Sequence, residues 1–116
     1  MIISLSAKGT EPVTINPDPA LVKVGDNVIW ELDFAPVGVL NAIEWTIYFS
    51  QANPFNGGKS SSWAQVIQAN GSDWTKALLN AGPALEEGDY KYGVRITNPA
   101  NREILSDDDP RLTVSR

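Results

Sequence analysis

The chain contains, at positions 42–50, the segment Ala42-Ile43-Glu44-Trp45-Thr46-Ile47-Tyr48-Phe49-Ser50. Large apolar residues stand at every second position, and the residues between them are mostly small or polar. Successive side chains of a β-strand point to opposite faces of its sheet. The segment therefore predicts a strand with one face buried and the other exposed.

Two further segments show the same period. In the segment 27–34 one face would carry Val28, Trp30, Leu32 and Phe34, with Ile29 as the one apolar residue on the other face. In the segment 90–97 one face would carry Tyr90, Tyr92, Val94 and Ile96. We expect these side chains and those of 42–50 to form the core, each contributing about 1.5–3 kcal/mol on burial before conformational entropy is subtracted.

Shorter strands are expected at 2–7, 13–15, 63–69, 103–106 and 111–115, separated by turn signals such as Asn70-Gly71. A short helix is predicted from Trp74 to Asn80, capped by Ser72 or Asp73. The pattern favours an all-β fold, an antiparallel Greek-key β-sandwich of about eight strands that allows this one helix.

Length and composition limit the classes of protein to which the chain could belong. The 116 residues, 42% hydrophobic and 20% charged, predict one soluble domain over residues 1–116. No window approaches the run of about 18 apolar residues that a membrane span needs. The net charge of −5 and the scattered lysines and arginines argue against a nucleic-acid partner.

The chain has no cysteine and no histidine. This excludes disulfides, thiolate nucleophiles and metal sites built on thiolate or imidazole donors. The start, Met1-Ile2-Ile3-Ser4-Leu5, has the pattern of a strand and not of a secretory signal. We expect a cytoplasmic location if Met1 is the native start, and export if a signal peptide was removed.

The segment 22–32 carries Val22-Lys23-Val24-Gly25-Asp26 before an alternating strand with Trp30, and it resembles the strand pair that precedes the first copper histidine of cupredoxins. The segment 88–92 together with 109–114 is similar to the last two strands of that family. The resemblance implies an eight-stranded Greek-key sandwich, cupredoxin-like or immunoglobulin-like. In copper-bearing members it also implies a site of two histidines, one cysteine and usually an axial methionine.

This chain departs from the family pattern at the copper ligands. Val94 stands two residues past Tyr92, where the cysteine would be expected, and the only methionine is Met1. The resemblance is therefore to a cupredoxin-like protein without copper ligands, of the kind found among uncharacterised bacterial proteins. We expect no cofactor, and the resemblance supplies a fold without a function.

Two groups of residues are weak candidates for ligand sites. Asp107, Asp108 and Asp109 could offer oxygen ligands to Ca²⁺, or they form a solvated turn whose charges protect a sheet edge. Trp63, Trp74 and Phe55, together with Tyr48, could form a platform for a sugar ring or an apolar ligand. The alternative for these tryptophans is that they cap the open end of the core.

Catalysis is not expected. The run Ser60-Ser61-Ser62 has no histidine to activate it, and Glu31 and Glu44 fall on the polar faces of their strands. The sequence favours a non-catalytic, metal-free binding or structural module that contacts a partner protein or a second copy of itself through edge strands. A carbohydrate-binding module that uses exposed tryptophans is the alternative.

Overall fold

The computed structural model of the chain describes residues 1–8, 13–35, 42–55, 61–68 and 75–116. These ranges contain eleven β-strands and no helix. The strands are β1 (Ile2–Lys8), β2 (Thr14–Asn16), β3 (Ala20–Lys23), β4 (Asn27–Ala35), β5 (Ala42–Phe49), β6 (Ser61–Gln68), β7 (Thr75–Pro83), β8 (Gly88–Lys91), β9 (Gly93–Asn98), β10 (Glu103–Asp108) and β11 (Arg111–Ser115).

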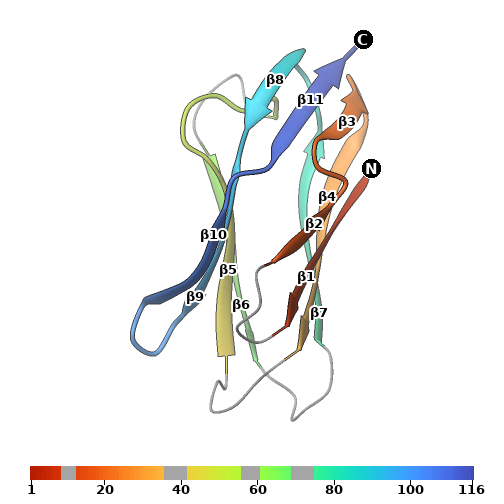
Figure 1. Cartoon of the computed structure of the whole chain (residues 1–116). Helices are drawn as coiled ribbons and strands as arrows, with labels where there is room; N and C mark the ends of the chain where they lie inside the picture. Colours follow the sequence, from red (N-terminus) through yellow and green to blue (C-terminus); the bar gives the residue numbers. More distant parts are fainter. Residues whose placement is uncertain (9–12, 36–41, 56–60, 69–74) are drawn as a thin grey trace.

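The strands form a two-layer sandwich with a smaller sheet across one end (Figure 1). One layer has the strand order β2-β1-β4-β7, and the layer facing it has the order β10-β9-β5-β6. The third sheet has the order β3-β11-β8. Only Tyr92 separates β8 from β9, so this third sheet continues one end of the β10-β9-β5-β6 layer.

The predicted all-β sandwich is confirmed, and the structure refines its details. Two of the three sheets are mixed, because β1 pairs parallel with β4 and β11 pairs parallel with β3, whereas the β10-β9-β5-β6 sheet is antiparallel throughout. The strands outnumber the expected eight partly because the predicted strand 90–97 is divided at Tyr92 into β8 and β9. No helix with the length and apolar character of a membrane span occurs among the described residues. The extent of the single domain expected over residues 1–116 stays a prediction.

The helix predicted from Trp74 to Asn80 is wrong for residues 75–80, which belong to β7. Trp74 itself lies outside the described residues. The ladder between β7 and β4 runs from Phe34 opposite Thr75 to Asn27 opposite Pro83. This pairing overrides the local helix signal, since tertiary context routinely outweighs propensity.

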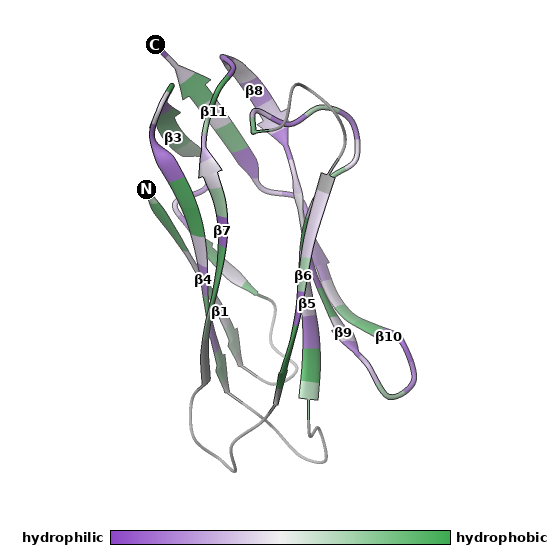
Figure 2. Ribbon diagram, turned by 180° about the vertical axis from the view of Figure 1, so that it is seen from behind, coloured by the Kyte–Doolittle hydropathy of each residue, from purple (hydrophilic) through white to green (hydrophobic). Residues whose placement is uncertain are grey.

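The alternation predicted for the three core segments is confirmed. The inward-facing residues of all three segments are buried: Val28, Trp30, Leu32, Phe34, Ile43, Trp45, Ile47, Phe49, Tyr90, Tyr92, Val94 and Ile96. Figure 2 shows the corresponding hydrophobic and hydrophilic bands along strands such as β4 and β11. Together with buried residues of β1, β3 and β11, these side chains form one core cluster.

Five aromatic rings meet inside the sandwich. The ring of Trp30 lies 5.5–6.3 Å, centroid to centroid, from those of Phe49, Phe55, Trp63 and Tyr92. Most of these contacts are edge-to-face, the arrangement that aromatic quadrupoles favour. Within the described residues, neither Trp30 Nε1 nor Tyr92 Oη has a hydrogen-bond partner, although both side chains are buried.

Burial raises the pKa of Tyr92 to about 12; the neighbouring Trp30 side chain acts in the opposite direction, and the negative charge of Asp18 adds to the rise. A pKa that is higher in the folded chain than in the unfolded chain stabilises the fold below the unfolded value, and this stabilisation is lost as the pH rises through the folded value. For Tyr92 the loss falls between pH 10 and about 12.

We therefore expect the free energy of unfolding to fall more steeply between pH 10 and about 12 in the wild type than in Tyr92→Phe, by about 2 kcal/mol. Tyr48 and Tyr90 titrate in both proteins and cancel in the comparison. At neutral pH, Tyr92→Phe should be at least as stable as the wild type, because it removes an unpartnered buried hydroxyl. Urea unfolding followed by circular dichroism measures both effects, and parallel alkaline curves would contradict the expectation.

Candidate functional site

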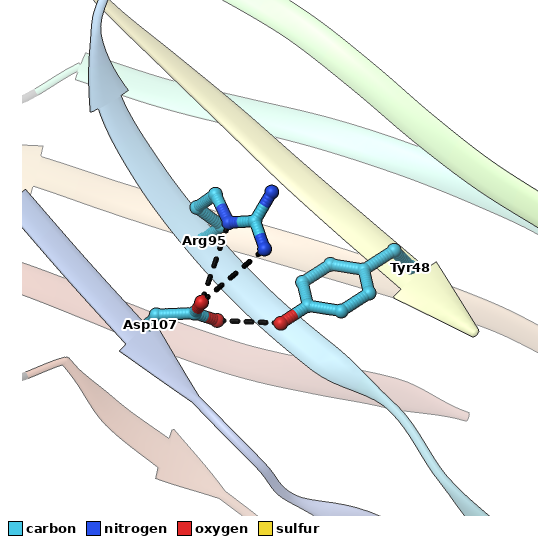
Figure 3. Close-up of polar contacts among 3 residues, drawn as sticks. All are labelled: Tyr48, Arg95 and Asp107. Atoms are coloured by element: carbon cyan, nitrogen blue, oxygen red, sulfur yellow. Dashed lines mark hydrogen bonds and ion pairs between the residues drawn. The ribbon is translucent and has the colours of Figure 1, made fainter. Parts of the chain in front are cut away.

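Three polar side chains form a cluster on the outward face of the β10-β9-β5-β6 sheet. Tyr48 extends from β5, Arg95 from β9 and Asp107 from β10 (Figure 3). The strand register brings them together, because Arg95 pairs with Thr46 on one side and with Asp107 on the other. Tyr48 and Arg95 each stand between two buried residues of their strands, so the alternation turns both away from the core.

The carboxylate of Asp107 joins the other two side chains. The Tyr48 hydroxyl donates a hydrogen bond of 2.6 Å to Asp107 Oδ1. Arg95 Nε and Nη2 both donate to Asp107 Oδ2, at 3.3 Å. The Arg95 guanidinium carbon also lies 4.7 Å from the centroid of the Tyr48 ring, within cation–π range. The cluster thus connects three strands on a partly exposed surface.

Tyr48 and Arg95 each keep one charge state around neutral pH. The hydrogen bond to Asp107, followed by burial, raises the pKa of Tyr48. Burial lowers the pKa of Arg95, but the negative charge of Asp107 and the contact with Tyr48 outweigh it, so the pKa of Arg95 is raised. Tyr48 therefore stays neutral and Arg95 stays charged. Both shifts move the pKa away from neutrality, whereas a general acid or base is most effective when its pKa lies near the working pH.

Gly93 makes room for the Tyr48 ring. The two residues are directly opposite each other on β9 and β5. A Cβ atom built on Gly93 would lie 2.0 Å from Tyr48 Cζ and 2.5 Å from its hydroxyl oxygen. The ring therefore lies across the backbone of β9, and the missing side chain of Gly93 is what permits this close approach.

Two shallow clefts flank the cluster, each of about 350 Å³. The first extends from Tyr48 and Gly93 towards Gln51, Asp89 and Lys91. The second extends in the other direction along the sheet and is lined by Glu44, Thr46, Arg95, Thr97, Arg102 and Ile104. Both have the size of small ligand or side-chain pockets.

The three aspartates predicted as weak calcium candidates do not converge. Asp107 binds Tyr48 and Arg95, Asp108 accepts a hydrogen bond of 2.9 Å from the Ser106 hydroxyl, and Asp109 lies 3.6 Å from Lys91 Nζ. Asp107 and Asp108 are consecutive in β10 and so point to opposite faces. In the ranges that the structure covers, no three His, Cys, Asp or Glu side chains are grouped to hold a metal ion.

The aromatic residues predicted as a ligand platform do not share one surface. Phe55 is buried and Trp63 is half-buried, and their rings pack against Trp30 in the interior. Tyr48 lies on the opposite, outward face of the same sheet. Trp74 lies outside the described residues. Phe55 and Trp63 thus contribute to the core, and the capping of its open end by tryptophans stays a prediction.

Arg95 and Gly93 are the members of the site that sequence reasoning missed. The alternation along this strand indicates that Arg95 points outward and that Gly93 lies on the same outward face. The sequence does not indicate that these positions lie opposite Thr46 and Tyr48, because the register between β5 and β9 is a tertiary property.

We expect Gly93→Ala to lower the free energy of unfolding by about 1–3 kcal/mol, because the added methyl group would displace the Tyr48 ring and break its hydrogen bond to Asp107. The matched control is the same substitution in a Tyr48→Ala background, where no ring occupies the space. There the cost should be much smaller, giving a coupling energy in a double-mutant cycle. Equal costs in the two backgrounds would show that the ring does not depend on Gly93.

No protein-family model and no curated protein sequence matches this chain. Among solved structures, the chain is similar to auracyanin A, a "blue" copper protein from the green thermophilic photosynthetic bacterium Chloroflexus aurantiacus, with 14% identity, a TM-score of 0.46, and coverage of 99% of this chain and 98% of that one. It is also similar to auracyanin B, with 12% identity, a TM-score of 0.46, and coverage of 99% and 88%. Unlike a copper-bearing cupredoxin, this chain has neither cysteine nor histidine.

Proposed function

We propose that this chain is a non-catalytic, metal-free binding module that contacts a partner protein through the outward face of its β10-β9-β5-β6 sheet. The observation that carries the proposal is the cluster of Tyr48, Arg95 and Asp107, fixed between two clefts on a sheet surface. Tyrosine and arginine are enriched at the energetic centres of protein interfaces. Side chains that are already held in place lose less conformational entropy when a partner binds.

The second cleft supports a particular chemistry for the partner. Arg102 makes no ion pair with any described residue, while the charge of Arg95 is shared with Asp107. Ile104 lines the same cleft and is 56% exposed. An arginine beside an exposed isoleucine matches a protein segment that presents a carboxylate next to an apolar side chain.

The test compares variants on the two outward faces of the sandwich. The double variant Arg102→Glu/Ile104→Asp changes the second cleft, and Leu78→Asp places the same kind of charge on the exposed side of β7 as a control. In affinity capture from an extract of the source organism, proteins retained by the wild type and by Leu78→Asp should be lost with the double variant. The recovered partner should then bind the double variant at least about tenfold more weakly in calorimetry, a difference of about 1.4 kcal/mol.

Identical capture by all three proteins, or no specific capture by the wild type, would contradict the proposal. Circular dichroism of each variant separates loss of binding from loss of the fold.

Oligosaccharide binding is the second candidate, and the first cleft favours it. Tyr48 lines this cleft beside polar side chains of Gln51, Asp89 and Lys91, a combination of one aromatic ring and several hydrogen-bonding groups. The wild type should then give specific signals on a glycan array, and Gln51→Ala should weaken them. A silent array would remove this candidate and leave the protein-binding proposal standing.

A further inference from the structure

The long edge strand β6 has one described neighbour. It is the last strand of the β10-β9-β5-β6 sheet and pairs antiparallel with β5 from Ser61 opposite Phe49 to Gln68 opposite Ala42. The register along these eight residues is unbroken. No strand in the described part of the chain pairs with its other edge, so its outward-directed backbone amide and carbonyl groups form a row open to another strand.

β6 also lacks the features by which other edges of this sandwich discourage strand addition. It carries no charged residue and no proline, reading Ser61-Ser62-Trp63-Ala64-Gln65-Val66-Ile67-Gln68. By contrast, β7 has a register break in its pairing with β4 and ends in Pro83. β10 has a register break and carries three acidic residues. The edge strands β2, β3 and β8 are only three or four residues long.

The side chains along β6 are incompletely covered. On its inward face Trp63 and Gln65 are only half-buried, and Leu79 and Ala81 of β7, in the facing layer, are half-buried as well. On its outward face Val66 is 48% exposed. A strand added beside β6 would cover apolar surface on both faces of the sheet.

We propose that this edge pairs antiparallel with β6 of a second copy of the chain, about a two-fold axis that passes between the Gln65 residues of the two copies. The charge pattern favours a second copy. Each chain carries a net charge of −5, so most surfaces of two copies repel each other, but the uncharged β6 brings no like charges together. Self-pairing through β10 would instead place Glu103 of one copy near Asp107 and Asp108 of the other. A two-fold axis uses the same patch on both copies and closes the assembly at a dimer.

The alternation of side chains limits the possible registers, and the partner of Trp63 chooses among them. Inward-facing residues of one copy must lie opposite inward-facing residues of the other if both cores are to stay covered. With the axis at Gln65, Trp63 lies opposite Ile67 of the second copy on the inner face, and Ala64 lies opposite Val66 on the outer face. An aromatic residue opposite a β-branched residue is a favourable cross-strand pair. A shift by one residue would place Trp63 opposite Val66, whose side chain faces the other way.

The first experiment measures mass against concentration by light scattering and sedimentation velocity. The wild type should pass from monomer to dimer between low and high micromolar concentration. Val66→Lys and Ala64→Lys each place a charge on the exposed face of β6 and should stay monomeric. Leu21→Lys, at a 66% exposed position on edge strand β3, is the matched control and should dimerise like the wild type. A wild type that stays monomeric, or lysine variants of β6 that dimerise like the control, would overturn the proposal.

The second experiment tests the register. Because the chain has no native cysteine, the introduced thiols are the only ones that can form a disulfide. Ala64→Cys and Val66→Cys proteins are mixed in an oxidised glutathione buffer. The two thiols should form a disulfide between unlike copies faster than either variant links to itself, because positions 64 and 66 lie directly opposite each other about the proposed axis. Preferential linkage of Ala64→Cys to itself, or no linkage, would overturn this register. Both experiments use the purified chain alone, so their outcome is independent of the partner proposed for the outward face.

Discussion

β5 is hydrogen-bonded on both edges, to β6 and to β9, and this double pairing fixes the orientation of the whole layer. Because its side chains alternate strictly, one register places Trp45, Ile47 and Phe49 in the core and leaves Glu44, Thr46 and Tyr48 outside. The same faces of the neighbouring strands are then buried and exposed, since residues directly opposite each other in a sheet point to the same side. A slip by one residue would expose the core and bury the polar face.

The candidate binding surface follows from the same constraint. Tyr48 reaches Asp107 two strands away only because the β9 residue between them is a glycine, over which the ring can lie. Arg95, two residues further along β9, then meets both the ring and the carboxylate. The outer surface of the layer is thereby organised by contacts between strands that are far apart in the sequence, with 59 residues separating Tyr48 from Asp107.

The two proposed interfaces use different physical properties of this one layer. The outward face offers fixed polar side chains beside an exposed isoleucine, which suits recognition of another protein by its side chains. The β6 edge offers backbone hydrogen-bonding groups and no charge, which suits pairing with a strand of the same sequence. Both depend on a sheet held firmly from behind, and the contacts among Trp30, Phe49 and Tyr92 supply that support from the core.

The sequence by itself determined the class of fold and which residues of the three main strands are buried. The reason is that an apolar residue at every second position can be recognised within one short segment, and it identifies the face of the strand that is buried. It also excluded a copper site of histidine and cysteine, since those residues are absent. It did not determine that residues 75–80 would extend beside β4, that Asp107 and Asp108 would face opposite ways, or that Gly93 would lie beneath Tyr48. These depend on strand pairing and register, which join residues distant in the chain and are decided only when the two layers pack.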